Sequence, residues 1–181
     1  MNNIKIDELT FELLIDHDQI QKRIRLIGID INVKYEHLNP VFVGVLNGCF
    51  MFMSDLMKQI HIPSELSFVK LASYNGLANE EINELIGVNT DLIGRHVVIV
   101  EDIVDTGNSL LHTMEALERH QVASIAVCTM LMKPNKLQHA FDNIMYVGFE
   151  IENEFVVGYG LDYNGQCRNL PHIYKQIESP S

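Results

Sequence analysis

Residues 97–109, VVIVEDIVDTGNS, decide how the fold of this chain is interpreted. The segment begins with four β-branched apolar residues, and such a continuous run is typical of a strand buried on both faces of a parallel sheet. Two acids, Glu101 and Asp102, follow the run, and a helical pattern begins at residue 109. In open α/β sheets, ligands bind outside the carboxyl ends of the strands. The stretch therefore predicts a parallel strand with a ligand site at its end.

The residues that follow predict a helix and a second strand. The apolar positions of SLLHTMEALERH at 109–120 recur at helical spacing and share one face: Leu110, Leu111, Met114 and Leu117. After this helix, VASIAVCTMLM at 122–132 is again a nearly continuous apolar run. Residues 97–132 are thus expected to form one strand, helix, strand unit.

A second unit of the same kind is predicted upstream. VFVGVL at 41–46 is typical of a buried strand, FMFMSDLMKQI at 50–60 keeps a broad apolar helical face, and LSFVKLASY at 66–74 predicts another strand. Two such units predict an α/β fold with a mostly parallel, twisted sheet, flanked by helices and joined by right-handed crossovers.

The remaining segments carry weaker patterns. Residues 18–35 predict an amphipathic helix from apolar residues at mostly helical spacing: Ile20, Ile24, Leu26, Ile27 and Ile31. The polar stretch 75–92 predicts a mobile loop or lid with a poorly specified edge element. MYVGF at 145–149 and FVVG at 155–158 predict shorter strands.

Length, charge and cysteine content limit the class of protein. A chain of 181 residues suits a single domain, and its formal net charge of −11 disfavours nucleic acid and anionic membranes as partners. The longest apolar runs are far shorter than the ~18 residues that cross a bilayer. The N-terminus carries acids where a secretory signal needs a basic start, and three separated cysteines suit reduced thiols. We therefore expect a cytoplasmic protein.

The turn after the strand at 97–101 carries groups suited to phosphate. It offers hydroxyls, a glycine that allows close backbone approach, and the free amides of a helix N-terminus; these come from Asp105, Thr106, Gly107, Asn108 and Ser109. The carboxylates of Glu101 and Asp102 would repel a phosphate unless sugar hydroxyls or a divalent cation lay between, so we expect Mg²⁺. The plain alternative is an N-capped helix in which Asp105 or Thr106 is the cap. Neither GxxxxGK[ST] nor GxGxxG is present.

These residues also resemble a known family. EDIVDTG at 101–107 is similar to the signature with which phosphoribosyltransferases bind 5-phosphoribosyl 1-diphosphate. The likeness extends to bacterial hypoxanthine(-guanine) phosphoribosyltransferases through NPVFVGVLNGCFMFMSDL at 39–56, LASY at 71–74 and EFVVGYGLDYNGQCRNLP at 154–171. It implies transfer of phosphoribose to a 6-oxopurine with release of pyrophosphate. It also implies the type I phosphoribosyltransferase fold in one domain, 1–181, with a core at about 37–145, a hood from 1–20 and 146–181, and a homodimer or homotetramer.

The resemblance implies a set of contact residues. For 5-phosphoribosyl 1-diphosphate they are Leu46, Asn47, Gly48, Ser73, Tyr74, Glu101, Asp102, Asp105, Thr106, Gly107, Asn108, Ser109 and Arg168. For the purine they are Ile103, Lys133, Phe155, Val156 and Asp162, and the expected magnesium ligands are Glu101, Asp102 and Asp162.

The resemblance also implies individual roles. Asp105 is the expected catalytic residue and accepts a proton at purine N7. Lys133 donates to the 6-oxo group, Phe155 stacks on the purine, and Arg168 pairs with pyrophosphate. Residues 73–74 begin the loop that closes over the reacting centre.

The residues alone allow plainer interpretations. A lone lysine such as Lys133 is usually solvated at the surface. A run such as FVV at 155–157 is ordinarily part of a core strand, and Asp162 and Arg168 are equally consistent with surface charges. Ser73 and Tyr74 could end a hairpin.

One position departs from the family pattern. Where the family often has a lysine in the loop whose backbone binds pyrophosphate, this chain has Asn47. That contact is made largely by backbone amides, in a loop that could contain a non-proline cis peptide. We therefore expect weaker pyrophosphate binding without loss of activity.

Two other functions are compatible with the same motif. One is a regulatory protein that senses 5-phosphoribosyl 1-diphosphate and binds nucleic acid, which the acidic charge disfavours. The other is a phosphoribosyltransferase for another base, such as xanthine. Lys133, Phe155 and Asp162 favour a 6-oxopurine through the resemblance alone.

Overall fold

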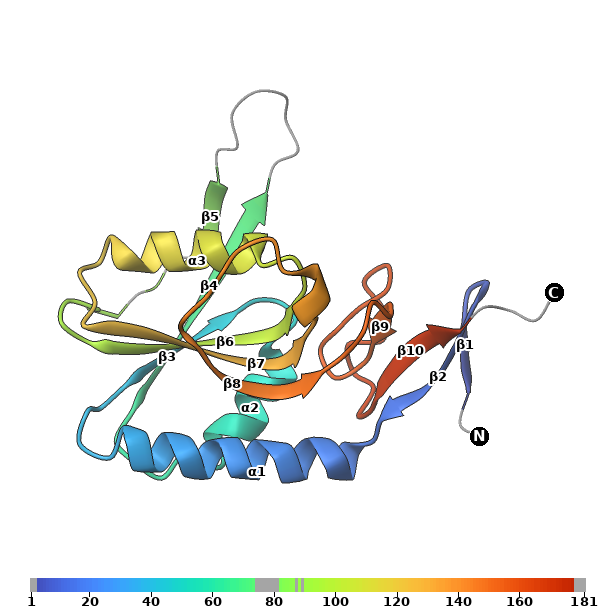
Figure 1. The fold of residues 1–181 in the computed structure, drawn as a ribbon, viewed down its shortest axis with the longest axis horizontal. Helices are drawn as coiled ribbons and strands as arrows, with labels where there is room; N and C mark the ends of the chain where they lie inside the picture. Colours follow the sequence, from blue (N-terminus) through green and yellow to red (C-terminus); the bar gives the residue numbers. More distant parts are fainter. Residues whose placement is uncertain (1–2, 74–81, 87, 89, 178–181) are drawn as a thin grey trace.

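The computed structural model describes residues 3–73, 82–86, 88 and 90–177. Its centre is a six-stranded sheet in the order β5-β4-β3-β6-β7-β8 (Figure 1). The strands are β3 (Val41–Val45), β4 (Glu65–Ser73), β5 (Ile82–Ile86), β6 (His96–Val104), β7 (Ser124–Met132) and β8 (Ile144–Glu150). All neighbours are parallel except β4 and β5, which pair antiparallel. The predicted α/β fold with a mostly parallel sheet is confirmed.

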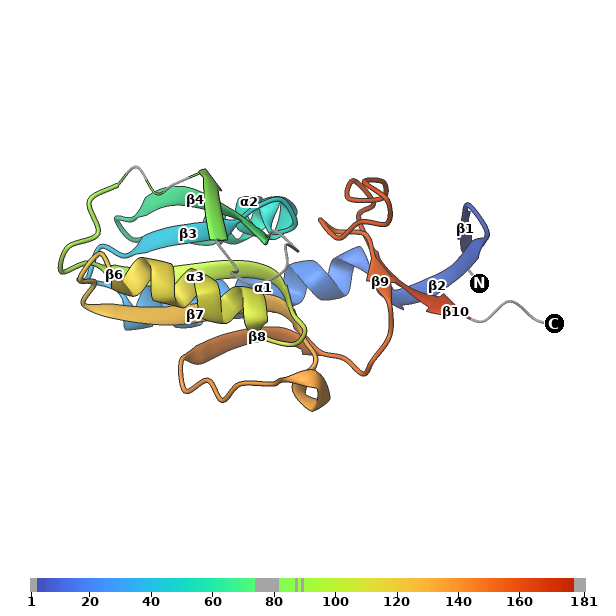
Figure 2. The same cartoon turned by 90° about the horizontal axis from the view of Figure 1, so that it is seen from above.

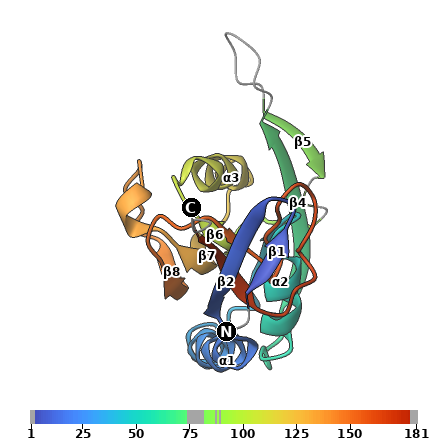
Figure 3. The same ribbon diagram turned by 90° about the vertical axis from the view of Figure 1, so that its right-hand side faces the viewer.

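Helices cover both faces of this sheet. In Figures 1 and 3, α3 (Asn108–Glu118) lies on one face, and α1 (His17–Lys34) and α2 (Phe50–Met57) lie on the other. Side chains alternate between the faces along each strand. Phe42 of β3 therefore packs into the cluster beneath α1 and α2, whereas Val43 packs into the cluster beneath α3.

The sequence pattern of α1 explains its limits and its buried face. The Asp16 carboxylate accepts a hydrogen bond from Gln19 N at 2.8 Å, and the Gln19 side chain accepts one from Asp16 N, which closes a capping box. The buried positions are Ile20, Ile24, Ile27, Gly28 and Ile31. Leu26, which we grouped with the apolar face, is 55% exposed because it lies two residues from Ile24, on the opposite side of the helix.

Three predicted boundaries are wrong for local reasons. The helix expected over 50–60 ends at Met57, because Gln59 N and Ile60 N donate to carbonyls only three residues earlier. The strand expected at 155–158 is shorter, β9 (Val156–Val157), because Gly158 turns away with φ +94°. The central strand does not end in its acids: β6 continues to Val104 through pairing with β7.

The hood expected from the terminal segments is present as a second sheet, although most of its strands were not predicted. It is antiparallel, in the order β1-β2-β10-β9, with β1 (Ile4–Ile6), β2 (Leu9–Ile15) and β10 (Ile173–Ile177). A small buried cluster of Phe11, Val157 and Tyr174 holds it together. Figure 2 shows this sheet beyond the carboxyl ends of the parallel strands. We call residues 151–177 together with β1 and β2 the hood.

The structure differs from the expected limits of core and hood. Helix α1 belongs to the buried cluster of the main sheet, although residues 21–36 were assigned to neither part. Strand β8 crosses the expected limit at 145 and ends at Glu150. A short 3₁₀ helix at Pro134–Lys136 follows β7. Within the described residues, no helix is long and apolar enough to cross a membrane.

Candidate active site

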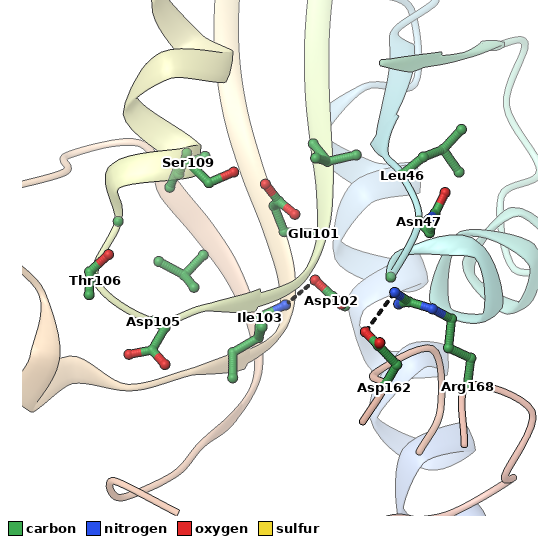
Figure 4. A pocket seen from close by; sticks show the side chains of 15 residues that line it. Leu46, Asn47, Glu101, Asp102, Ile103, Asp105, Thr106, Ser109, Asp162 and Arg168 are labelled. Carbon is green, nitrogen blue, oxygen red and sulfur yellow. Dashed lines mark hydrogen bonds and ion pairs between the residues drawn. The ribbon is translucent and has the colours of Figure 1, made fainter. Parts of the chain in front are cut away.

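A pocket lies where the strand order of the main sheet reverses, between β3 and β6. β3 is followed through α2 by β4 on one side, whereas β6 pairs with the other side of β3, so the carboxyl ends of β3 and β6 form a topological switch point. A cavity of about 340 Å³ opens there (Figure 4). Its walls come from residues 45–48, 101–107, 109–110, Asp162 and Arg168.

Glu101 and Asp102 form the floor of this pocket. Glu101 is only 5% exposed, and burial followed by the neighbouring charge of Asp102 raises its pKa well above the ordinary value. Burial also raises the pKa of Asp102 to about 6, although the amide of Ile103 donates to its carboxylate at 2.9 Å. Two carboxylates held in such surroundings favour a counter-charge between them and any phosphate.

The turn between β6 and α3 leaves the helix N-terminus open to a ligand. Gly107, with φ +86°, is the N-cap residue in place of Asp105 or Thr106, and the Thr106 hydroxyl accepts only a long hydrogen bond of 3.4 Å from Asn108 N. A side chain at Gly107 would overlap the ring of Phe141. The first turn of α3 carries no acidic residue, so its free amides and positive dipole end are available to an anion.

Asn108 and Ser109 complete this turn differently. Ser109 lines the pocket. The side chain of Asn108 instead contacts His139 Nε2 through Oδ1 at 2.6 Å and donates from Nδ2 to Gln138 Oε1 at 3.4 Å. The amide of Gln138 donates to Thr106 O. Residues 138–139 thus support the turn from behind, and Asn108 belongs to that support.

Two lysines hold Asp105. Lys133 donates from Nζ to one carboxylate oxygen at 2.9 Å, and Lys136 Nζ lies 3.4 Å from the other. Partial burial would raise the pKa of Asp105, but the hydrogen bond and charge of Lys133 and then Lys136 lower it below the ordinary value. Asp105 is therefore an ionised acceptor at neutral pH. Lys133 is 5% exposed, so the surface interpretation from the residues alone is wrong.

Asp162 and Arg168 approach the pocket from the hood. The Arg168 guanidinium contacts Asp162 at 2.6 Å and donates to Gly160 O at 2.7 Å. The backbone at Gly160 lies so close to Gly48 that a side chain there would overlap Gly48 O. The interpretation of both charges as plain surface residues is therefore wrong, because they contact each other in the pocket wall.

The loop after β3 supplies the facing wall. The Leu46–Asn47 peptide is cis, and Asn47 accepts a hydrogen bond from Lys70 Nζ at 3.2 Å. A side chain at Gly48 would overlap Asp102 Oδ2, so only glycine lets this loop lie against the carboxylates. Figure 4 shows Leu46 and Asn47 across the pocket from Thr106 and Ser109.

The expected purine residues lie outside the pocket lining, except for Ile103 and Asp162. Phe155 is 43% exposed, and its ring centroid lies 6.1 Å from that of Phe11 and 5.9 Å from that of Tyr163. Val156 is buried in β9 and pairs with Lys175 of β10.

Half of the loop predicted at 75–92 lies outside the described residues, namely 75–81, 87 and 89. Tyr74 is not among the described residues, and Ser73 is described only as the last residue of β4. The edge strand β5 lies inside this stretch.

Sequence reasoning missed two lysines beside the site. Lys136 reaches Asp105 because a single 3₁₀ turn, Pro134–Lys136, follows Lys133 directly. The proline between the two lysines was the sequence signal for this turn. Lys70 reaches Asn47 through the register of β3 and β4, which no local pattern encodes.

The carboxylates fit magnesium only together with a substrate. Among the described residues, no group of three or more His, Cys, Asp or Glu side chains could cage a metal. Mg²⁺ usually takes one or two carboxylates, several waters and substrate phosphates. Glu101 and Asp102 supply the carboxylates at the pocket floor, and the phosphates would come from the substrate.

Comparisons with known proteins agree with this site. A model of the phosphoribosyl transferase domain matches residues 13–164. Hypoxanthine phosphoribosyltransferase of Haemophilus influenzae is 39% identical over 171 residues, covering 92% of this chain and 95% of that protein. The bifunctional protein TilS/HprT of Listeria innocua is 40% identical over 90% of this chain, and the match spans 25% of that longer protein.

Solved structures point the same way. A hypoxanthine phosphoribosyltransferase from Staphylococcus aureus has a TM-score of 0.86 at 36% identity, covering 92% of this chain and 91% of that chain. The resemblance drawn from residues 101–107 is thereby confirmed. The chain belongs to the phosphoribosyltransferase family, among the bacterial hypoxanthine(-guanine) phosphoribosyltransferases.

Proposed function

We propose that this chain transfers the 5-phosphoribosyl group of 5-phosphoribosyl 1-diphosphate to N9 of hypoxanthine, and of guanine, and releases pyrophosphate. One observation carries the proposal: the pocket joins an open helix N-terminus to a buried carboxylate pair and a hood arginine. Those parts suit, in order, a phosphate, a metal-bound sugar and a second anion.

The 5′-phosphate is assigned to the turn at 105–109. The amides of the first turn of α3 donate to its oxygens, and the hydroxyls of Thr106 and Ser109 add further donors. Because Gly107 carries no side chain, the phosphate can approach the backbone closely. The first turn of α3 carries no acid to oppose it, and the carboxylate of Asp105, before the helix, is held by Lys133 and Lys136.

The ribose and the pyrophosphate are assigned to the floor and the facing wall. Glu101 and Asp102 would hold Mg²⁺, with Asp162 as the further expected ligand. When bound, the ion would supply positive charge that offsets the charge developing on the leaving pyrophosphate. Arg168 and the backbone of residues 46–48 bind that leaving group.

The purine is assigned to the side of the pocket between β6 and the hood, where Ile103 and Asp162 lie. Phe155 stacks on the ring, the backbone of Val156 pairs with its edge, and Lys133 donates to its 6-oxo group. Lys133 must then turn away from Asp105, and Lys136 remains close enough to hold the carboxylate in place.

In the reaction, the bond from N9 to the anomeric carbon forms as the bond to pyrophosphate breaks. The transition state has oxocarbenium character, as at glycosidic centres generally. The proton on the purine passes from N7 to the ionised carboxylate of Asp105. Positioning and charge neutralisation supply the rest of the acceleration.

The assembly, the location and the partners of the chain are expected from the same family resemblance. We propose a cytoplasmic homodimer or homotetramer that acts on small molecules and binds neither nucleic acid nor membrane. Light scattering on the purified chain would measure the assembly directly.

The experiment is a spectrophotometric assay with 5-phosphoribosyl 1-diphosphate, Mg²⁺ and each of hypoxanthine, guanine, xanthine and adenine, with a chelator control. We expect magnesium-dependent nucleotide formation from hypoxanthine and guanine. Binding of 5-phosphoribosyl 1-diphosphate without reaction of any base would instead indicate a sensor, and reaction with xanthine alone would assign another base.

A further inference from the structure

The pocket carries more negative than positive charge. Four lining residues are acidic, namely Glu101, Asp102, Asp105 and Asp162, whereas Arg168 is the basic residue among the described lining. The guanidinium of Arg168 is already held by Asp162 at 2.6 Å. The nearby ammonium groups of Lys133 and Lys136 are held by Asp105. An anion bound near residues 46–48 would therefore share each of these cations with an acid.

Lys70 brings a further ammonium group to that wall. β4 runs parallel to β3, and Leu46 N donates to Val69 O at 2.9 Å, so Lys70 lies beside the peptide that joins Leu46 to Asn47. Its Nζ donates to Asn47 Oδ1 at 3.2 Å. Asn47 lines the pocket and Lys70 does not, so the ammonium group reaches the pocket wall through its contact with Asn47.

The partner of Lys70 in this contact differs in kind from those of the other basic groups. An amide oxygen is neutral and accepts a hydrogen bond without cancelling the charge of the ammonium group. An ammonium group has three donors, and the contact with Asn47 uses one of them. The asparagine therefore positions the charge without neutralising it, whereas the acids beside Arg168 and Lys133 neutralise theirs.

We propose that Lys70 binds the pyrophosphate group of the substrate, with Asn47 holding its ammonium group at the pocket rim. This inference rests on the proposed function and deepens it. It differs from the expectation that Asn47 weakens pyrophosphate binding, because Lys70 would supply the cation from the neighbouring strand.

The test measures binding of magnesium pyrophosphate by isothermal titration calorimetry. Lys70→Met keeps the apolar stem and removes the charge, and Lys70→Arg keeps the charge. Loss of a charged hydrogen bond raises Kd by roughly 10- to 100-fold, and we expect a rise of this size for Lys70→Met. Lys70→Arg should stay within roughly threefold of wild type, because the charge remains.

Charge relocation separates binding from strand packing. Lys70→Asn should lose affinity like Lys70→Met, and the double variant Asn47→Lys/Lys70→Asn should recover most of it, because the cation returns to the rim from β3. Lys34→Met is the matched control: it removes one exposed positive charge at the end of α1, which precedes the amino end of β3, whereas the pocket lies at the carboxyl end of that strand.

The outcomes are distinct. Wild-type affinity in Lys70→Met, or a double variant as weak as Lys70→Asn, overturns the role of Lys70. An equal loss in Lys34→Met would assign the effect to net charge and also overturn it. If the wild-type protein binds neither pyrophosphate nor 5-phosphoribosyl 1-diphosphate, the proposed function itself fails. Thermal unfolding of each variant confirms that it is folded when titrated.

Discussion

The two walls of the pocket are built in different ways. One wall is a single continuous segment, residues 101–110, in which a strand, a turn and the first turn of a helix follow one another. The other wall is assembled from the loop after β3 and the hood residues Asp162 and Arg168, and Lys70 of β4 contacts this wall at Asn47. A ligand on the first wall depends on local geometry, whereas a ligand on the second depends on contacts between distant segments.

The largest expected effect lies in the continuous wall. Asp105→Asn should retain phosphate binding and lose roughly 10²- to 10⁴-fold in kcat, the usual worth of general acid–base help. The measurement is steady-state kinetics with saturating substrates. The control is the Kd of ribose 5-phosphate, which should change little. Near-normal kcat would remove Asp105 from proton transfer.

The corresponding change in the assembled wall should act on binding. Arg168→Met removes a pocket cation that also holds Asp162 and the Gly160 carbonyl, so the Kd of pyrophosphate should rise roughly 10- to 100-fold. Titration calorimetry measures this change. If ribose 5-phosphate weakens by the same factor, the two walls do not act separately.

Two glycine substitutions separate the effect of backbone strain on stability from the effect of a damaged phosphate turn on binding. Gly107→Ala places a side chain at φ +86° against the ring of Phe141, so we expect a loss of about 1–3 kcal/mol in stability together with weaker ribose 5-phosphate binding. Gly94→Ala is the matched control, since Gly94 has φ +68° but open space around its Cβ position. It should lose stability only. Denaturant unfolding and calorimetry distinguish the two, and unchanged phosphate binding in Gly107→Ala would contradict this assignment.

The smallest expected effect concerns the joint between core and hood. Asp55 of α2 accepts hydrogen bonds from Tyr159 OH and Gln21 at 2.7 Å and from Lys58 at 2.8 Å. Burial would raise the pKa of Asp55, but these bonds lower it below the ordinary value. The stabilisation is therefore present above the unfolded pKa of about 4 and is lost as pH falls through the folded pKa.

Asp55→Asn tests that joint. Wild type should lose stability more steeply than the variant as pH falls below about 4, because only the wild type must protonate this carboxylate. Thermal unfolding between acidic and neutral pH measures the difference. Parallel pH profiles for the two proteins would show that Asp55 contributes no such stabilisation.

The difference between the walls also explains what the sequence could predict. Residues 97–109 carry strand, turn and helix signals in one stretch, so the continuous wall was found, although its strand extends further because β7 keeps pairing with it to Val104. The strands β1, β2 and β10 were missed because they are short, come from opposite ends of the chain and pair only in the folded protein.

The assembled wall shows the limit more sharply. The contact of Lys70 with Asn47 depends on the parallel register of two strands, and the contact of Gly160 with Gly48 depends on how the hood lies over the core. Neither has a local signature. The burial of Lys133 is a third case, since its side chain is enclosed by the fold and held by Asp105.

The most direct test of the two-wall account measures two ligands against two variants. Ribose 5-phosphate and magnesium pyrophosphate would each be titrated into Thr106→Val, which alters the continuous wall, and Lys70→Met, which alters the assembled wall. The account predicts that Thr106→Val weakens ribose 5-phosphate only and Lys70→Met weakens pyrophosphate only. If either variant weakens both ligands by the same factor, or weakens the opposite one, the account is contradicted.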